Sequence, residues 1–428
     1  MKIAVVGLWH LGMVTAASLA AVGHIVCAID DPSVISAIER GKMPVDEPGL
    51  ADLVTEQKRA SRLAFTADAR AAGDAELIWI CYDTPVDDSD RPDVDSVIER
   101  ASEFLASFAG SAVVAVSSQL PVGSTAVLEQ RFPDGRFAFA CIPENLRLGS
   151  AIAYFRNPDR FVIGTRSGSP AKYVIERALG TFAKTLVFMS VESAEMTKHS
   201  INAFLATSVT FANELASICE RVGADAREVE RGLKSDGRVG PKAYVRAGES
   251  FSGGTLARDL GFLANLGDDF GLPLEQVRAT ASSNVRHRDW ALDRVCDFVG
   301  DRPVRIAFLG LVYKPGTDTL RASNAVNLAR TLRDLGHMLV GFDPAISVGD
   351  ERLAGILEIS SSVQAALMGA EIAVIATSWP VFREVPVADF KRLMKRCNVI
   401  DESRFLEETL RDVDDINYAA FGLARVVS

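Results

Sequence analysis

One pattern occurs twice in this chain, at its beginning and again near residue 300. KIAVVG (2–7), a helical pattern at 11–21 and HIVCAID (24–30) form a βαβ unit that ends on an acid. RIAFLG (305–310) and LGHMLVGFDP (335–344) repeat its two strands. A buried strand, a helix and a second strand in this order are typical of a parallel α/β sheet. The repeat therefore predicts two α/β halves with other structure between them.

Strands and helices continue to alternate in both halves. Further strands are expected at 77–83, 111–118, 138–145 and 160–165 in the first half, with a helix at 94–109, and at 372–377 and 398–403 in the second. This alternation predicts two Rossmann-like, doubly wound parallel sheets, which bind ligands at the carboxyl ends of their strands. The residues of the first half expected at that edge are Gly7, Asp30, Asp83, Ser118 and Glu144.

A long helix is predicted between the two halves, at 194–222, with Ser193 as its cap and Gly223 just past its end. At about 1.5 Å per residue it would run roughly 40 Å. Lys198 and Asn202 are four residues apart and project from one face. They are either a solvated lysine and a locally bonded asparagine, or a polar pair directed into a cleft between domains.

Shorter elements follow the long helix. Helices are expected at 225–233, 260–266 and 274–299, separated by a loop at 235–259 that is rich in glycine and charged residues. The resulting division is 1–192, 193–299 and 300–428.

Composition narrows the class of protein. The 428 residues carry a net charge of -10 with no lysine or arginine run, which argues against a nucleic-acid surface. No apolar run reaches the length of a membrane span, and no signal peptide is evident. Six scattered cysteines without CxxC spacing indicate buried free thiols in a reducing compartment, and five separated histidines offer no metal cluster. The expectation is a cytoplasmic enzyme without a metal.

The turn after the first strand reads G-L-W-H-L-G, with Gly7 and Gly12 at fingerprint positions of a dinucleotide site. The following helix would offer its positive end to a pyrophosphate, and Asp30 could hold a ribose hydroxyl pair. Trp9 stands where the fingerprint has glycine. On these residues alone, a βαβ unit without any ligand remains the alternative.

Several longer motifs agree in order and spacing with one family over essentially the whole chain. They are EPGL (47–50), DTP (83–85), LPVGST (120–125), PENLRLGSA (143–151), FRNPDR (155–160), AEMTKHSINAFLAT (194–207), FSGGTLARD (251–259) and YKPGTDTLRAS (313–323). The chain resembles the UDP-glucose/GDP-mannose dehydrogenase family of nucleotide-sugar dehydrogenases. Such enzymes oxidise the C6 hydroxymethyl of a nucleotide-linked hexose to a carboxylate with two NAD.

The resemblance implies a role for each part of the chain. Residues 1–192 would bind NAD, residues 193–299 would form a helical dimerisation region with a substrate loop, and residues 300–428 would bind the nucleotide sugar. The expected partners are a nucleotide-sugar substrate and a second copy of the chain, joined through the central helix. No nucleic acid or membrane is expected to bind.

The resemblance also implies three groups of site residues. The catalytic positions are Glu144, Lys198, Asn202, Thr255 and Asp259. The cofactor positions are Gly7, Trp9, His10, Leu11, Gly12, Asp30, Thr84, Ser118 and Arg321. The substrate positions are Leu146, Arg238, Tyr244, Arg246, Phe251, Gly254 and Lys314. Lysine and asparagine can stabilise an alkoxide, and Asp259 can orient them or relay a proton. YVRAG (244–248) resembles the GDP-mannose branch more than the UDP-glucose branch.

The chain departs from the family pattern at several active-site positions. Thr255 stands where the family has its nucleophilic cysteine, Gln119 where a threonine positions the hydrolytic water, and Leu148 where a second glutamate follows the PE pair. Trp9 replaces a glycine of the cofactor turn, and Ala322 replaces an acid. A threonine hydroxyl has a far higher pKa than a thiol and is a poor nucleophile without a dedicated base.

These departures predict an oxidoreductase that does not complete the usual four-electron oxidation. It would release an aldehyde, or return the hydride as an epimerase or reductase. Two alternatives stay open, which are a conventional uronate-forming enzyme and a catalytically silent nucleotide-binding homologue.

Overall fold

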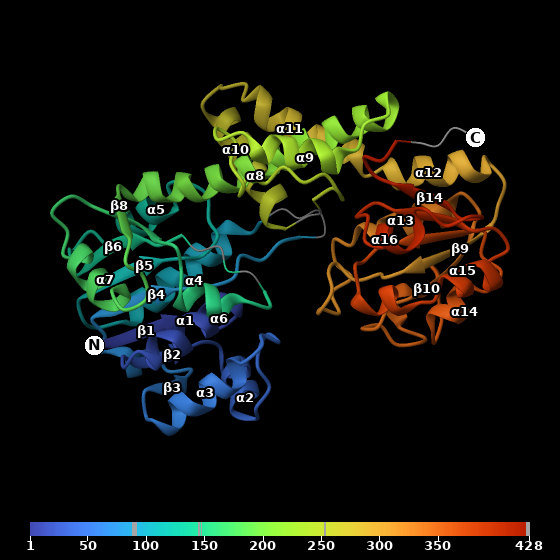
Figure 1. Cartoon of the computed structure of the whole chain (residues 1–428). Coiled ribbons are helices and arrows are strands. Elements are labelled where there is room, and N and C mark those ends of the chain that lie inside the picture. The colour runs from blue at the N-terminus through green and yellow to red at the C-terminus, as the bar shows by residue number, and fades with distance from the viewer. Residues whose placement is uncertain (88–91, 144–145, 147, 252–253, 425–428) are drawn as a thin grey trace. The chain divides into compact units, whose positions relative to one another are not determined.

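The computed structural model describes residues 1–87, 92–143, 146, 148–251 and 254–424. The chain divides into two compact units, residues 1–201 and residues 202–428, each with its own sheet and core. Figure 1 labels the helices and strands of both units. The predicted division into three domains at 192/193 and 299/300 stays a prediction.

The first unit is built on an eight-stranded sheet with the order β3-β2-β1-β4-β5-β6-β7-β8. All neighbouring strands run parallel except β6 and β7, which are antiparallel. The predicted doubly wound parallel sheet is therefore confirmed, with an antiparallel step towards one edge. The strands are β1 (Lys2–Val6), β2 (Ile25–Ile29), β3 (Leu63–Thr66), β4 (Leu77–Ile80), β5 (Ala112–Val116), β6 (Phe137–Cys141), β7 (Phe161–Thr165) and β8 (Leu186–Met189).

Helices cover both faces of this sheet, as the lower left of Figure 1 shows. Successive residues of β1 face opposite sides, so Ile3 and Val5 join one buried cluster and Ala4 and Val6 join another. This explains why the strand reads as a continuous apolar run. The helices are α1 (His10–Ala21), α2 (Pro32–Glu39), α3 (Leu50–Arg59), α4 (Val94–Ser107), α5 (Ser124–Arg131), α6 (Ala151–Arg156) and α7 (Ala171–Leu179).

The second unit carries a six-stranded, fully parallel sheet with the order β11-β10-β9-β12-β13-β14. Its strands are β9 (Arg305–Leu309), β10 (Met338–Phe342), β11 (Glu358–Ile359), β12 (Ile372–Ile375), β13 (Asn398–Asp401) and β14 (Asn417–Ala420). Its helices around the sheet are α13 (Asn324–Asp334), α14 (Val363–Leu367), α15 (Val387–Leu393) and α16 (Glu407–Leu410).

The sequence repeat is confirmed in detail. Gly7 and Gly310 follow β1 and β9 with φ of 89° and 94°, a region that favours glycine. An acid follows the second strand of each repeat and accepts backbone N–H groups of the turn. Asp30 accepts from the residue after Gly7, and Asp343 accepts from the two residues after Gly310. Both halves thus close the same turn in the same way.

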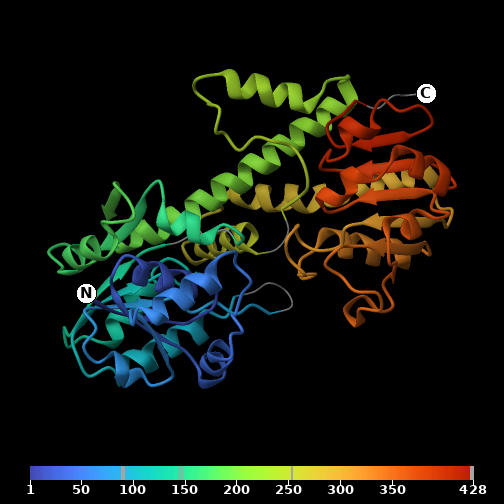
Figure 2. The same cartoon turned by 60° about the horizontal axis from the view of Figure 1, so that its bottom comes forward.

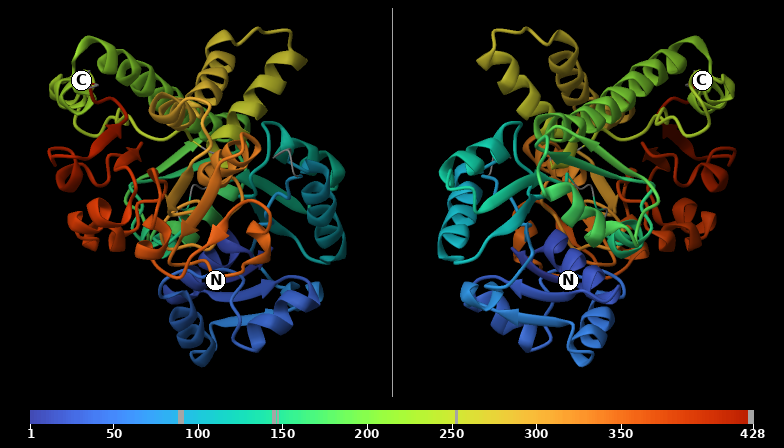
Figure 3. Two further views of the ribbon diagram at one scale, coloured as in Figure 1. Left: turned by 90° about the vertical axis from the view of Figure 1, so that its right-hand side faces the viewer. Right: turned by 90° about the vertical axis from the view of Figure 1, so that its left-hand side faces the viewer.

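The remaining helices of the second unit are α9 (Ala226–Ser235), α10 (Thr255–Asp269), α11 (Glu275–His287) and α12 (Trp290–Val299). Figure 3 shows α10 and α11 packed side by side as a helical pair. The single helix predicted at 274–299 is wrong, because the chain breaks between α11 and α12. The helix predicted at 260–266 is longer than expected and begins at Thr255.

The predicted long helix is confirmed as α8 (Val191–Val222), which Figure 2 shows as one unbroken rod. Its start was misplaced, because the hydroxyl of Ser190 accepts the backbone N–H of Ser193 and takes the capping position. Glu195 of α8 accepts the backbone N–H groups of Gly123 and Thr125 and so caps α5. The helix therefore begins three residues before the predicted start at 194.

Some side chains are more exposed than the sequence predicted. Phe211 and Ile218 of α8 are exposed in this single chain. All six cysteines are free thiols as predicted, but Cys296 is exposed and Cys27 and Cys397 are only partly buried. Within the residues that the structure describes, no helix combines the length and apolar character needed to cross a membrane.

Candidate active site

The turn between β1 and α1 depends on its two glycines. A Cβ on Gly7 would lie 2.6 Å from the backbone nitrogen of Tyr82, and one on Gly12 would lie 1.8 Å from the carbonyl oxygen of Gly7. Trp9 has φ of -78°, so its position does not require glycine, and its side chain is half exposed. The substitution at Trp9 is therefore compatible with the turn, and the α1 N-terminus keeps the geometry of an anion site.

Asp30, His10 and Leu11, three residues at or beside this turn, each make a different kind of contact. One carboxylate oxygen of Asp30 accepts the backbone N–H of Leu8 at 2.5 Å, and the other lies 3.2 Å from Arg100. His10 contacts the carboxylate of Glu47 at 3.1 Å. Leu11 packs against the apolar core of the first unit, so its side chain serves the fold.

Two hydroxyls follow neighbouring strands of the first sheet, Thr84 after β4 and Ser118 after β5. Thr84 is buried and donates from Oγ1 to the carbonyl of Gln119 at 2.7 Å. The Oγ of Ser118 is buried, and within the described part of the chain it has no hydrogen-bond partner. A buried hydroxyl without a partner at the carboxyl edge of a Rossmann sheet suits a polar ligand group. Together with the glycine turn and Asp30, it shows that the residues present fit a dinucleotide.

The second repeat lacks this fit. Asp343 is almost fully buried, and one of its oxygens also accepts the indole N–H of Trp379 at 3.2 Å. The backbone N–H groups of Leu311, Val312 and Ala345 also donate to Asp343, so its carboxylate is held within the chain. The two halves share a turn, but Asp343 is more deeply buried than Asp30, whose side chain is 9% exposed.

Glu47 was quoted in the EPGL motif without a role, and the structure supplies one. It is buried and accepts the backbone N–H groups of Gly149 and Ala151, both at 2.7 Å, as well as contacting His10. It thus connects the start of α1 with the segment that carries Leu146, which packs against the core. Glu144, a predicted catalytic residue, lies outside the described residues.

Lys198 of α8 is 7% exposed, so the interpretation as a solvated lysine is wrong. The thiol of Cys141, at the end of β6, lies close enough to Lys198 to interact with its charge. Burial raises the pKa of that thiol far above its usual range, and the nearby Glu195 adds to the rise while Lys198 opposes it. A thiol that stays protonated is not a nucleophile.

The second unit brings two predicted catalytic residues together. Nδ2 of Asn202 donates to the carboxylate of Asp259, and both side chains are buried. Gly254, with φ of 100° and ψ of -139°, precedes α10 in a conformation that favours glycine. Thr255 is the exposed first residue of α10, so its hydroxyl is accessible, and the loop before it brings no cysteine.

Two predicted substrate residues share a pocket of about 510 Å³ in the second unit. Tyr244 and Arg246 line it together with Val209 of α8 and with Ser378 and Phe405, which follow β12 and β13. The pocket thus lies at the carboxyl edge of the second sheet, where ligands of α/β folds bind.

The other predicted substrate and cofactor residues lie elsewhere. Arg238 is exposed and pairs with its neighbour Asp236 at 2.8 Å, so it is not part of the pocket lining. The backbone of Phe251 is fixed by both side-chain groups of Asn284. Lys314 and Arg321 lie on the loop between β9 and α13, and Arg321 is exposed.

Comparisons with known proteins agree with this arrangement. Sequence profiles of the UDP-glucose/GDP-mannose dehydrogenase family match the NAD binding domain at residues 1–178, the central domain at 192–286 and the UDP binding domain at 307–408. The chain is 34% identical over 409 residues to UDP-glucose 6-dehydrogenase TuaD of Bacillus subtilis, covering 94% of this chain and 88% of that protein. It is 33% identical over 435 residues to UDP-glucose 6-dehydrogenase of Rhizobium meliloti, covering 99% of each.

Solved structures give the same result. A UDP-glucose dehydrogenase of Pyrobaculum islandicum superposes with a TM-score of 0.87 at 26% identity, covering 99% of this chain and 98% of that one. A UDP-D-ManNAc dehydrogenase of Pyrococcus horikoshii superposes with a TM-score of 0.86 at 25% identity and full coverage of both chains. The glycine turn of the first unit and the three matched domains lead to one conclusion. The chain belongs to the UDP-glucose/GDP-mannose dehydrogenase family, whose members are NAD-dependent nucleotide-sugar oxidoreductases.

Proposed function

We propose that this enzyme oxidises a CH–OH group of a nucleotide-linked sugar by one hydride transfer and does not proceed to the acid. The observation that carries this proposal is Thr255 at the start of α10, the position that the family resemblance assigns to the nucleophilic thiol. NAD supplies the hydride acceptor when bound. The alcohol loses a hydride and a proton, which leaves a carbonyl, NADH and H⁺.

The chain's own residues support the first oxidation. Lys198 offers a positive charge from a buried position on α8, where a developing alkoxide is strongly stabilised. The amide nitrogen of Asn202 has two hydrogens, of which one goes to Asp259, so the second can be donated to a substrate oxygen. Because Asp259 is fully buried, we assign it the role of holding that amide in position and not of passing a proton to solvent.

The second oxidation lacks its nucleophile. A thiol would add to the aldehyde and make a thiohemiacetal that can lose a second hydride. Thr255 has a hydroxyl there, and none of the six cysteines lies in the loop before α10 or in α10 itself. The carbonyl product is therefore released. Where the oxidised group is a secondary alcohol, the ketone can instead receive the hydride back on its other face and leave as an epimer.

The nucleotide part of the substrate is assigned to the second unit. Tyr244 and Phe405 provide aromatic surfaces in the pocket of about 510 Å³, and Arg246 provides a cation for a phosphate. The named relatives suggest a UDP-sugar, while YVRAG favours a GDP-sugar. Incubation with NAD and a panel of UDP- and GDP-sugars, analysed by mass spectrometry, tests the proposal. A product two mass units lighter than one of the sugars supports it.

Two other functions would give different results with the same panel. A uronate would show an ordinary complete oxidation, in which the enzyme dispenses with the cysteine. A silent nucleotide-binding homologue would turn over no sugar and would show no thermal stabilisation by NAD, because a ligand well above its Kd stabilises the folded state. The half-exposed Trp9 beside the turn is the feature that would then block the cofactor.

We also propose a homodimer through α8. Phe204, Phe211 and Ile218 recur every seven residues and are 70%, 48% and 55% exposed, so they form one apolar stripe along the helix. A second copy of the same helix is the occupant that the family resemblance implies. Analytical ultracentrifugation should give a dimer, and Phe211→Asp should give a monomer. A monomeric wild-type protein would contradict the assignment. A cytoplasmic location, expected from the sequence, stays a prediction.

A further inference from the structure

Arg100 of α4 meets three groups that follow the strands of the first sheet. Its Nη2 donates to Asp30 at 3.2 Å and to Asp31 at 2.8 Å, both just after β2. Its guanidinium carbon lies 4.2 Å from the centre of the Tyr82 ring, which follows β4. The arginine side chain is still 38% exposed, so part of the guanidinium faces solvent.

The end of β2 is where a Rossmann βαβ unit receives the adenosine ribose of its cofactor. An acid there binds the ribose 2′-hydroxyl, and an arginine there accommodates a 2′-phosphate. This chain has both kinds of residue in contact. Two carboxylates surround one guanidinium, which leaves the position with a net negative charge that repels a 2′-phosphate.

The two carboxylates are not equivalent. Asp30 is 9% exposed on its side chain and is held by the backbone N–H groups of Leu8 and Asp31. The side chain of Asp31 is 64% exposed. Asp31 is thus the outer partner of Arg100, and its removal would release a donor without disturbing the turn after β1.

We propose that Arg100 and Asp31 together set the choice of NAD over NADP. Arg100 is a latent phosphate ligand at the adenosine ribose, and Asp31 occupies and neutralises it. Stacking on Tyr82 fixes the plane of the guanidinium, so that its exposed edge forms a wall of the ribose site. The inference concerns cofactor choice, and it holds whether one or two hydrides leave the sugar.

Arg100 could instead be only a structural link between α4 and the end of β2. The two roles differ in what happens when Asp31 is changed. A structural link predicts at most some loss of stability and equal effects on both dinucleotides. A specificity role predicts that NADP binding improves while NAD binding stays nearly constant, and that the improvement requires Arg100.

Isothermal titration calorimetry of the full chain with NAD and with NADP, without sugar, tests this. We expect wild-type protein to bind NADP at least ~100-fold more weakly than NAD. Asp31→Asn should tighten NADP binding about tenfold or more, because it frees one charge contact of Arg100 for the 2′-phosphate. It should change the affinity for NAD less than threefold. Asp31→Asn combined with Arg100→Ala should lose the gain. Thermal melts of every variant check the fold.

Asp52→Asn is the matched control, since it removes an exposed carboxylate of the same unit, on α3, and changes the net charge equally. It should leave both affinities unchanged. The proposal is overturned if this control tightens NADP binding equally, or if Asp31→Asn does not tighten it. It is also overturned if the gain in NADP affinity persists when Arg100 is replaced by alanine. Failure of wild-type protein to bind NAD would contradict the cofactor itself, and the sugar panel tests the reaction separately.

Discussion

The side-chain amide of Asn202 donates a hydrogen bond to the carboxylate of Asp259, and both groups are buried in the second unit. Changing Asn202 to Ala would leave that carboxylate without this donor. A hydrogen bond to a charged group is worth ~1.5–3 kcal/mol, so urea unfolding should show a loss of up to this size. Turnover should fall with it.

The variant Asp259→Asn tests whether Asp259 acts by holding Asn202 in position or through its own negative charge. An asparagine in that place can still accept the amide hydrogen of Asn202, so the role in positioning predicts that much of the turnover survives. A proton relay through Asp259 predicts that turnover disappears and that its pH profile changes. Steady-state kinetics from pH 6 to pH 9 distinguishes the two outcomes.

Lys198→Met should abolish turnover while leaving the fold intact. Loss of a positive charge beside a developing alkoxide typically lowers kcat by ~10²-fold or more. Lys184→Ala, which removes an exposed lysine of the same unit, is the control and should keep wild-type kinetics. Unchanged turnover in Lys198→Met, with a normal melting temperature, would remove this lysine from the chemistry.

Thr255→Cys should give the enzyme a nucleophile at the start of α10. The new thiol is expected to add to the aldehyde, so intact-protein mass spectrometry after incubation with sugar and NAD should show a covalent adduct. Gln119 and Leu148 replace residues that the family uses for hydrolysis. We therefore expect the covalent adduct to accumulate, with little of it converted to acid. Thr255→Ser is the control and should form none. An adduct-free Thr255→Cys variant with normal first oxidation would show that the reacting carbon is elsewhere.

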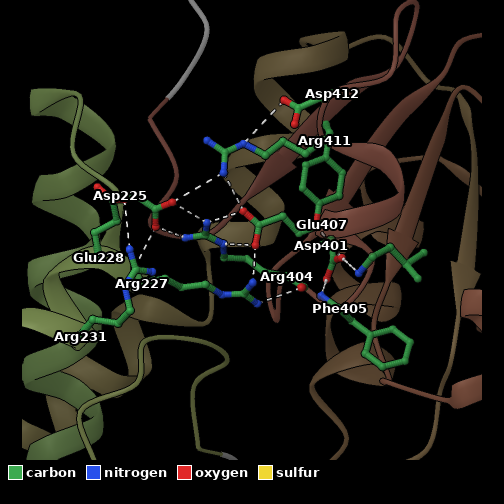
Figure 4. Close-up of polar contacts among 12 residues, drawn as sticks. Asp225, Arg227, Glu228, Arg231, Asp401, Arg404, Phe405, Glu407, Arg411 and Asp412 are labelled. Atoms are coloured by element: carbon green, nitrogen blue, oxygen red, sulfur yellow. Dashed lines mark hydrogen bonds and ion pairs between the residues drawn. The ribbon is translucent and has the colours of Figure 1, made fainter. Parts of the chain in front are cut away.

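The ion-pair network in Figure 4 predicts how acid weakens the second unit. Asp225 caps α9 and pairs with Arg404, which also pairs with Glu407. Hydrogen bonds from Arg404 lower the pKa of Asp225 to about 2, against the opposing effect of burial. A lowered pKa in the folded state stabilises the protein above pH 4, and this contribution is lost as the pH falls from 4 to 2.

Asp225→Asn tests that contribution, because asparagine keeps the helix cap and removes the charge. A pKa decrease of this size corresponds to about 2 kcal/mol at neutral pH. Urea unfolding at pH 7 should therefore show the variant to be less stable by about that amount, and the difference should shrink towards pH 3. A constant difference at both values would mean that the loss comes from packing and not from the charge.

Much of the fold could be predicted from local patterns. The strand at 2–7 was placed within one residue, since its side chains are buried on both faces and the apolar run is continuous. The start of α8 was missed because two serines, Ser190 and Ser193, both suit a cap and only the structure shows which one accepts the N–H. The sequence predicts one helix at 274–299 because no glycine or proline at residues 288–289 indicates the break between α11 and α12.

The site was predictable only where short motifs carry it. Gly7, Gly12 and Asp30 follow from a fingerprint, and Asn202 with Asp259 follows from the family resemblance. Glu47 and Arg100 make their decisive contacts with residues far away in the sequence, Gly149 and Asp31, so no local pattern indicates them. Arg238 is the opposite case. The family resemblance assigned it to the substrate, but it is exposed and pairs with its neighbour Asp236.

In the proposed reaction a single hydride leaves the sugar and no thiol traps the carbonyl. The most direct measurement is the amount of NADH formed per sugar consumed, with the product mass determined on the same sample. A single hydride transfer gives no more than one equivalent of NADH and no carboxylate. Two equivalents of NADH together with a uronate would contradict it.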